Sequence, residues 1–287
     1  MTAPDLIVVG DALLDVVADA PALLEGGDAR GSVRVRPGGQ GANVAAWAAS
    51  EGLRVRLHGR VGDDGSGRLV REALEERGVE TALAVDPEAP TGTLLVLARR
   101  GERSMVADRG AAARLEASDL PRTIEAGAVL VSGYLLFDPG SEGAGRAALD
   151  RARAGHVAVE ASSWPLLEAY GADRFLEATA AATLLLANER EAEVLAGVPG
   201  EEAAVKLSAR YRIAVAKLGT RGAALASADV LLRSPAKEVA AVDPTGAGDA
   251  FDAALLATLV RRRSLGRALD HAITTGGWVV SREEAWP

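Results

Sequence analysis

The sequence of 287 residues contains no cysteine, only three histidines and few aromatic residues. The absence of cysteine excludes disulfide bonds, thiol catalysis and zinc or iron–sulfur sites bound by cysteine. His58, His156 and His271 lie too far apart in the chain to show the spacing of metal ligands. We therefore interpret each histidine as a packing or surface residue.

The sequence also lacks an excess of positive charge and long hydrophobic runs. Lysine and arginine total 32 against 40 acidic residues, a net charge of -8 that gives no general attraction for nucleic acid or an anionic membrane. We interpret the basic run 261–263 as a solvated helix end. The apolar run 178–187 has about half the length of a membrane span, and the first residues lack the basic start of a secretory signal. We expect a cytoplasmic protein that binds neither nucleic acid nor membrane.

Short apolar runs alternate with longer alanine-rich amphipathic stretches, which is typical of parallel strands joined by helices. This pattern predicts an α/β sandwich with a mostly parallel sheet. The expected strands are Leu6–Val9, Val129–Val131, Val157–Val159, Thr183–Leu186 and Ile213–Ala216, and the expected helices are 41–50, 65–77, 141–154, 189–196, 247–263 and 266–280.

Two stretches break this alternation. Thr93–Ala98 and Arg103–Ala107 flank a polar turn and predict a hairpin, and Ser32–Arg36 predicts a short strand. We expect these strands to form a small sheet above the main one, from about 11–36 and 91–109. Because no repeat or interdomain linker is evident, we predict one domain over 1–287 rather than two.

The segment 243–251, Asp-Pro-Thr-Gly-Ala-Gly-Asp-Ala-Phe, is a glycine-bearing turn that leads into an apolar helix. Gly246 and Gly248 allow the backbone to approach a ligand closely, and the helix N-terminus favours an anion. Asp249, in the first turn, is placed to accept a proton from an attacking hydroxyl. The segment therefore indicates phosphoryl transfer, against the alternative of a structural turn followed by an acidic helix start.

A second glycine cluster, Pro37-Gly-Gly-Gln-Gly-Ala-Asn43, opens another alanine-rich helix. It does not match a dinucleotide fingerprint, because Val44 stands where the third glycine belongs. No Gly-Lys-Ser or Gly-Lys-Thr occurs in the sequence, so a Walker-type phosphate loop is excluded.

Taken in order, the two glycine clusters resemble the two signatures of the ribokinase (PfkB) family of carbohydrate kinases. The resemblance extends over nearly the whole chain through Gly10 with Asp15, Gly59–Asp63, Asn188–Glu191 and Lys217–Gly222. It implies a ribokinase-like three-layer α/β/α sandwich with a mostly parallel central sheet and a small β-lid. It also implies transfer of the γ-phosphoryl group of ATP to a hydroxyl, usually a primary alcohol, of a small sugar.

The resemblance assigns roles in phosphoryl transfer to the segment 243–251. Asp249 would be the base, and the backbone of Gly246, Ala247 and Gly248 would form the anion hole. This agrees with the chemistry, which requires mainly positioning and charge neutralisation. Asp243 marks the place beside which relatives hold a monovalent cation such as K⁺. The last residues, 281–287, lack the glycine-alanine that usually completes that site.

The nucleotide end has two further matches. Asn188 and Glu191 correspond to the element that organises Mg²⁺ and its waters, although a helix N-cap explains them as well. Lys217, Gly219 and Gly222 correspond to the loop along the nucleotide, although a plain strand–turn–strand is an equal explanation.

At the sugar end, Asp15, Gly39 and Asn43 match the substrate contacts of the family. A carboxylate and an amide suit vicinal hydroxyls. Gln40 stands where ribokinases often carry lysine. Arg109 is a further candidate for substrate contact, because a basic lid would suit a sugar acid or a sugar phosphate.

Three hypotheses remain open from the sequence: a sugar kinase, a nucleoside kinase of the same fold, and a binding protein without catalysis. Neither lid segment contains an aromatic residue, which favours a bare sugar over a nucleoside. Tyr134, Phe137 and Trp164 keep the nucleoside open as stacking surfaces. The family also implies a homodimer that pairs through the lid.

Overall fold

The computed structural model describes residues 3–20, 26–99, 102–282 and 286–287. Its central sheet has the strand order β13-β12-β11-β10-β9-β8-β1-β4-β5. The strands from β11 to β5 in this order run parallel, and β12 and β13 form an antiparallel hairpin at one edge. The strands are β1 (Leu6–Val9), β4 (Val55–Gly62), β5 (Val79–Asp86), β8 (Ile124–Ser132), β9 (Ala152–Glu160), β10 (Leu184–Asn188), β11 (Ile213–Lys217), β12 (Ala223–Ser227) and β13 (Val230–Ser234).

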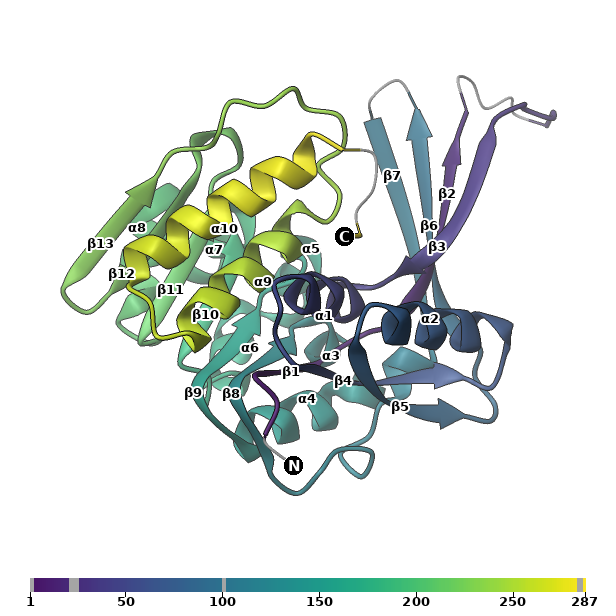
Figure 1. Ribbon diagram of the computed structural model, residues 1–287, viewed down its shortest axis with the longest axis horizontal. Coiled ribbons are helices and arrows are strands. Elements are labelled where there is room, and N and C mark those ends of the chain that lie inside the picture. Colours follow the sequence, from purple (N-terminus) through teal and green to yellow (C-terminus); the bar gives the residue numbers. More distant parts are fainter. Residues whose placement is uncertain (1–2, 21–25, 100–101, 283–285) are drawn as a thin grey trace.

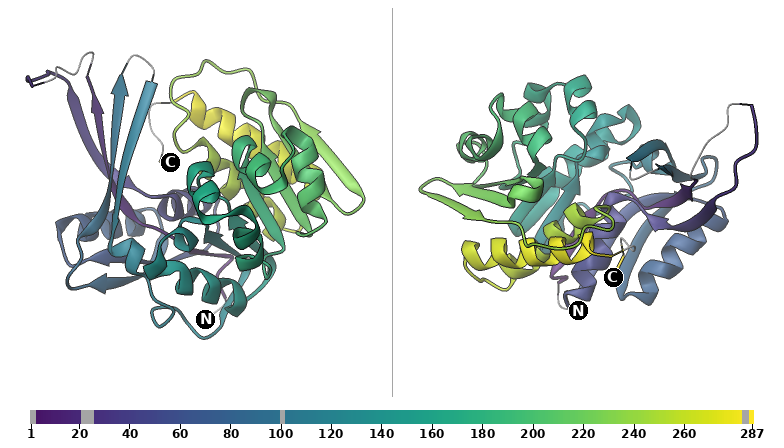
Figure 2. Two further views of the ribbon diagram at one scale, coloured as in Figure 1. Left: turned by 180° about the vertical axis from the view of Figure 1, so that it is seen from behind. Right: turned by 90° about the horizontal axis from the view of Figure 1, so that it is seen from above.

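Helices cover both faces of this sheet, because its buried strands carry apolar side chains on both sides. In β1, Leu6 and Val8 belong to one hydrophobic core, and Ile7 and Val9 belong to the other. Figure 2 shows the resulting three layers, which agree with the predicted sandwich. The first face packs against α1 (Gln40–Ser50), α2 (Gly65–Glu76), α9 (Ala247–Val260) and α10 (Leu265–Val280); the second packs against α3 (Tyr134–Phe137), α4 (Pro139–Arg151), α5 (Trp164–Tyr170), α6 (Ala172–Ala178), α7 (Glu189–Ala196) and α8 (Gly200–Ser208).

A second sheet of four strands projects from this body beside α1 and α2 (Figure 1). Its order is β3-β2-β6-β7, where β2 and β6 are parallel and the outer pairs are antiparallel. We call it the small sheet; it consists of β2 (Leu13–Asp19), β3 (Ser32–Gly38), β6 (Thr91–Arg99) and β7 (Glu102–Gly110). Residues 100–101 of the predicted hairpin turn lie outside the described residues.

The predicted helix 141–154 is wrong at its C-terminal end. The helix α4 stops at Arg151, and Ala152 already begins the strand β9, which pairs with β8. The alanine and arginine residues there favour a helix, but pairing along a buried parallel sheet overrides that propensity. Similarly, α9 ends at Val260 instead of 263.

Packing of α1 against α9 determines where the site forms. Both helices are rich in alanine, and small side chains let their backbones lie close together (Figure 1). Each helix starts at a glycine with a positive φ, 92° at Gly39 and 79° at Gly246, a region open to few other residues. The two glycine clusters, distant in sequence, therefore come together as neighbouring helix N-termini.

Candidate active site

A cavity of about 1750 Å³ lies where the N-termini of α1 and α9 meet the carboxyl ends of the central strands and the small sheet. Carboxyl ends of parallel strands are the usual place for ligands in an open α/β sheet. The sequence-predicted site residues all line this cavity except Asp243. The structure thus brings the expected sugar, phosphate and nucleotide contacts into one space.

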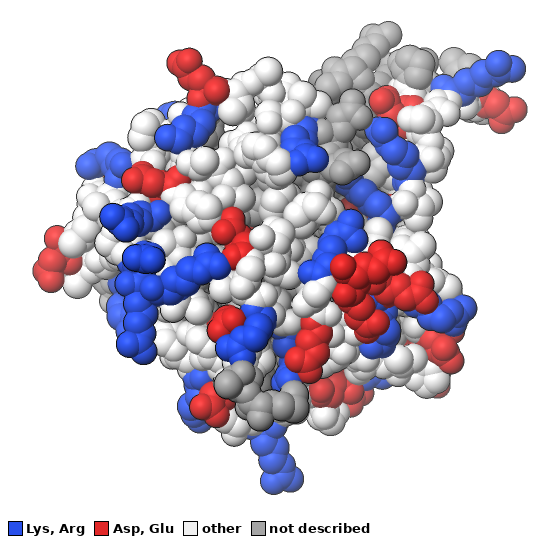
Figure 3. All heavy atoms as spheres, viewed as in Figure 1, with Lys and Arg blue, Asp and Glu red and all other residues white. Residues whose placement is uncertain are grey.

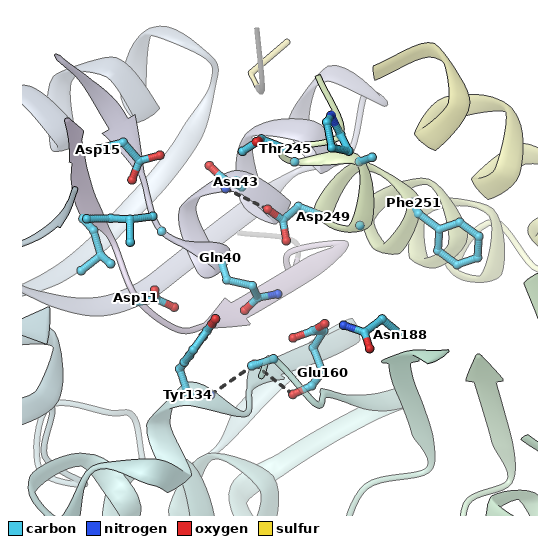
Figure 4. A pocket seen from close by; sticks show the side chains of 18 of the residues that line it. Asp11, Asp15, Gln40, Asn43, Tyr134, Glu160, Asn188, Thr245, Asp249 and Phe251 are labelled. Carbon is cyan, nitrogen blue, oxygen red and sulfur yellow. Dashed lines mark hydrogen bonds between the residues drawn. The ribbon is translucent and has the colours of Figure 1, made fainter. Parts of the chain in front are cut away.

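Asp249 lies half-buried in the first turn of α9, at the centre of this arrangement. Its Oδ2 accepts a hydrogen bond of 2.8 Å from Nδ2 of Asn43 on α1 (Figure 4). Burial raises the pKa of the Asp249 carboxyl well above its usual range, while the bond from Asn43 opposes that rise. A carboxyl with a raised pKa is better matched to taking a proton near neutral pH.

The turn before α9 presents backbone N–H groups at the positive end of the helix. The N–H of Ala247 already donates to the carbonyl of Pro244 at 3.2 Å. A Cβ atom on Gly248 would lie 3.5 Å from Nζ of Lys217, so this part of the turn faces the ammonium group. Helix end and ammonium together make this corner of the cavity suitable for phosphate.

Lys217, the last residue of β11, belongs to a buried ionic cluster that the sequence did not reveal. Its Nζ lies 3.0 Å from Asp252 Oδ2 and 3.4 Å from Glu160 Oε1. Burial by itself would lower the pKa of Lys217, but Asp252, Glu160 and Glu191 outweigh it and raise the pKa, so the ammonium stays charged. Three carboxyl groups face one ammonium here, and their oxygens are the kind of ligand that a further cation such as Mg²⁺ prefers.

Asn188 and Glu191 form a reciprocal capping box at the start of α7. The Glu191 N–H donates to Asn188 Oδ1 at 2.9 Å, and the Asn188 N–H donates to Glu191 Oε2 at 2.7 Å. Burial, followed by the charge of Glu160, raises the pKa of Glu191 to about 8. The two residues are therefore a helix cap and a part of the cavity wall at the same time.

The chemistry of this wall fits Mg²⁺ with its waters. The Glu160 Oε2 atom is buried, lacks a hydrogen-bond partner and belongs to a residue that lines the cavity. Within the described part of the chain, no three acidic or histidine side chains cluster closely enough to hold a metal ion by themselves. Mg²⁺ commonly keeps several waters and binds through one or two carboxylates and substrate phosphates, which this arrangement allows.

The loop after β11 carries Gly219 and Gly222, both on the cavity wall. A Cβ atom on Gly222 would lie 2.0 Å from the carbonyl oxygen of Ser234. Close packing of the loop against the end of β13 therefore requires this glycine, independently of any ligand. Around Gly219, by contrast, a Cβ atom would meet no other atom within 4 Å.

At the other end of the cavity, Asp15 on β2 is buried with an Oδ1 atom that lacks a hydrogen-bond partner. Its Oδ2 lies 3.8 Å from Nε of Arg36 on the neighbouring strand. Burial raises the pKa of Asp15 to about 7; the charge of Asp11 adds to the rise and Arg36 opposes it. A Cβ atom on Gly38 would collide with this carboxylate, so that glycine makes room for it.

Arg109 at the end of β7 reaches the same end of the cavity. Its Nε lies 2.7 Å from Asp138 Oδ2, its Nη1 lies 4.0 Å from Asp11 Oδ2, and the guanidinium stacks 4.9 Å from the ring centre of Tyr134. Its Nη2 atom is buried without a hydrogen-bond partner. Arg109 is thus held in place by Asp138 and Asp11, which were not predicted from the sequence, and by Tyr134, which was predicted only as a stacking surface; a donor is left for a ligand.

Gln40, which stands where ribokinases often carry lysine, points into the cavity (Figure 4). Both its Oε1 and its Nε2 are buried without a hydrogen-bond partner. A buried amide without partners is costly unless a ligand satisfies it. Gln40 is therefore a further candidate contact, which replaces the positive charge of a lysine with a neutral donor and acceptor.

Asp243 does not line the cavity. Its Oδ1 accepts from the N–H of Thr245 at 2.7 Å, and its own N–H donates to the carbonyl of Val280 at 3.1 Å. It stabilises the turn before α9 and joins that turn to the end of α10.

On the face seen in Figure 3, basic and acidic side chains are interspersed. The three histidines lie outside the cavity wall. In the described residues, helices of the length and apolar character needed to cross a membrane do not occur.

The pfkB family carbohydrate kinase model matches residues 3–286. The chain therefore belongs to this family and is a phosphotransferase. It is 30% identical over 301 residues to the aminoimidazole riboside kinase of Salmonella typhimurium, covering 97% of this chain and 89% of the relative. It is 32% identical over 256 residues to an ATP-dependent ribose-1-phosphate kinase of Halopiger xanaduensis, covering 88% and 83%.

The fold is shared with solved structures of the family. The adenosine kinase from Sinorhizobium meliloti superposes with a TM-score of 0.88 at 24% identity, over 100% of this chain and 96% of that one. The ribokinase-like α/β/α architecture predicted from the sequence is thereby confirmed.

Proposed function

We propose that this protein transfers the γ-phosphoryl group of ATP to a hydroxyl group, expected to be a primary alcohol, of a small sugar or sugar derivative in the cytoplasm. The observation that carries the proposal is the position of Asp249. It lies at the N-terminus of α9, between the phosphate corner with Lys217 and the sugar end with Asp15, and all three residues line one cavity.

In the proposed reaction the acceptor oxygen attacks the γ-phosphorus while the bond between that phosphorus and the bridging oxygen breaks. ADP leaves with the electron pair, and the acceptor's proton passes to the Asp249 carboxylate. Backbone N–H groups of Gly246 and Gly248 stabilise the charge on the transferred group, joined by that of Ala247 when it turns from the carbonyl of Pro244. Asp15, Gly39, Asn43 and Arg109 orient the acceptor, and the lining residues Gly219 and Gly222 face the nucleotide.

Bound Mg²⁺ would neutralise phosphate charge. Asn188 and Glu191, with Glu160 beside them, would hold its waters, because all three residues line that part of the cavity and carry oxygen ligands. K⁺ would bind near Asp243 and would act by fixing the turn before α9, since Asp243 already bonds Thr245 in that turn. A higher rate in K⁺ than in an equal concentration of a larger organic cation would support this part.

A nucleoside acceptor is the second candidate. Tyr134 and Phe137 line the cavity, whereas Trp164 does not, so two of the three stacking surfaces expected from the sequence are available to a base. Relatives named as a riboside kinase and an adenosine kinase agree with this alternative.

The small sheet offers a surface for a second copy of this chain. Val35, Val16, Leu95 and Val106 are paired in register and form one apolar row across it. Val35 is 54% exposed and Val106 is 62% exposed. Because adjacent strand residues point to opposite faces, this row lies on the face away from Asp15. We propose that two copies pair through this face and that the small sheet acts as the lid.

The first experiment measures ATP consumption with Mg²⁺, with and without K⁺, across pentoses, ketohexoses, sugar acids, sugar phosphates and nucleosides. We expect one acceptor class to stimulate ADP release strongly over the rate without acceptor. Comparable ADP release with and without every acceptor would argue against a kinase of this kind.

The Asp249→Asn variant tests the base. We expect kcat to fall by about 10²- to 10⁴-fold while acceptor binding is retained, because the amide cannot take the proton. Asp173→Asn is the matched control, since Asp173 also lies in a helix first turn but is exposed and outside the cavity. Full turnover in Asp249→Asn would contradict the assigned mechanism.

A further inference from the structure

The penultimate residue, Trp286, is buried in the hydrophobic core although it lies at the very end of the chain. Its side chain is only 8% exposed, and the Arg77 guanidinium at the end of α2 lies 4.9 Å from the centre of its ring system. Its indole Nε1–H donates a hydrogen bond to Oδ1 of Asn43. The end of the chain therefore returns to the first turns of α1.

The same Asn43 amide donates from Nδ2 to Oδ2 of Asp249 at 2.8 Å. An amide side chain has one oxygen that accepts and one nitrogen that donates, and either can face a given partner after a flip. The indole nitrogen only donates, so Trp286 attracts the oxygen of Asn43 and repels its NH₂ group. With the oxygen held by Trp286, the NH₂ group is directed to Asp249.

We propose that Trp286 is a positioning residue for phosphoryl transfer: it fixes the orientation of the Asn43 amide and thereby the carboxylate of Asp249. This inference rests on the proposed role of Asp249 as the base. It assigns a role to the C-terminal end of the chain, where the sequence departs from the usual family pattern. Trp286 does not line the cavity itself and acts through Asn43.

Loss of the indole N–H has a defined consequence. The Asn43 amide is then free to flip, which would place its oxygen against a carboxylate oxygen of Asp249. The carboxylate would lose a donor that favours its ionised form, and its pKa would rise further. Proton acceptance would then require a higher pH.

The test compares Trp286→Phe with wild type in the presence of the best acceptor. Phenylalanine retains an aromatic ring in the core but removes the donor. We expect kcat at pH 7 to fall about tenfold, the acid limb of the kcat profile to move to higher pH, and the KM for ATP to stay within about twofold. Trp278→Phe is the control, because Trp278 is 47% exposed, packs edge-on against Trp47 and lies outside the cavity wall; it should keep wild-type kinetics.

A double-mutant cycle separates positioning from packing. In an Asn43→Ala background, Trp286→Phe should cause no further loss of kcat, because the amide through which it acts is gone. Trp286→Leu, which also lacks the N–H, is measured in the same way. A cooperative thermal melting curve shows that a variant is folded before its kinetics are compared with wild type.

Four results distinguish a failure of this inference from a failure of the proposed function. Wild-type kcat and pH profile in a folded Trp286 variant would overturn the inference, as would an equal loss of kcat with and without Asn43. If either of these results is obtained while Asp249→Asn is inactive, the proposed function stands and only the role of Trp286 is removed. Full turnover in Asp249→Asn would instead remove the proposed base, and with it the basis of this inference.

Discussion

Asp15 gives the clearest pH dependence at the scale of single residues. Burial raises the pKa of Asp15 to about 7, and the ionised carboxylate, with two accepting oxygens, binds two hydroxyl groups of the substrate more strongly than the neutral acid does. The ionised fraction of a group with this pKa rises about tenfold between pH 6 and pH 8. We therefore expect the KM for the acceptor to fall by up to about tenfold over this range in steady-state assays.

The same group affects stability in the opposite direction. Because the folded protein holds the Asp15 proton more tightly than the unfolded chain does, its contribution to the free energy of unfolding is lost as pH rises from 3.8 to about 7. In Asp15→Asn, both the KM for the acceptor and the free energy of unfolding should depend less on pH. The control is Asp19→Asn, at an exposed position on the same strand. A KM that is equally pH-dependent in Asp15→Asn would count against the assignment.

Single residues also show what the sequence leaves hidden. Asp249, Asn43 and Asp15 were predicted because short motifs surround them. The residues that orient these side chains were not predicted. Trp286 is separated from Asn43 by 243 positions along the chain, and no local pattern connects the two. Likewise, the lysine predicted beside the nucleotide, Lys217, owes its charge to Glu160 and Asp252, which only the assembled sheet brings near it.

At the scale of elements, the start of α9 depends on one glycine. Gly246 has φ 79°, where a residue with a Cβ atom is strained by about 1–2 kcal/mol. We expect Gly246→Ala to lower the free energy of unfolding by about that amount and to reduce kcat, because the N–H groups and Asp249 follow this turn. Denaturant titration and initial rates check both effects.

Gly143→Ala provides the control for that substitution. Gly143 lies exposed inside α4 at an ordinary helical φ, and a Cβ atom there meets nothing within 4 Å. Alanine should stabilise this helix by about 0.5–1 kcal/mol and leave kcat unchanged. A stabilising Gly246→Ala with full activity would contradict the role of the turn.

Elements with a strong periodic pattern were predicted well, and α7 was placed at its observed bounds. The strand β4 was missed because Arg56 and Arg60 interrupt its apolar run, although both side chains find acidic partners in the fold. The start of β9 was predicted as a helix, since its pairing with β8 is not encoded locally. These errors arise where long-range pairing outweighs local propensity.

At the scale of the whole molecule, the cavity depends on two bodies of structure meeting. The central sheet and its helices supply the phosphate corner, and the small sheet supplies Asp15 and Arg109. The sequence indicated both sheets and the order of the motifs. It did not indicate that an apolar row would run along the outer face of the small sheet, because that row joins residues from four strands.

The proposed dimer makes that row testable. Val35→Asp places a charge at the β3 end of the apolar row that two copies would bury, and an unpaired buried charge is strongly unfavourable. We expect wild-type protein to show the mass of a dimer in light scattering, and Val35→Asp to show that of a monomer. If the lid needs its partner to close, acceptor-dependent turnover should fall and ADP release without acceptor should form a larger share of the total.

Val230→Asp is the control, because Val230 is 42% exposed on the distant edge strand β13. A monomeric wild-type mass at assay concentration, or a dimer that survives Val35→Asp, would show that this face does not join two copies.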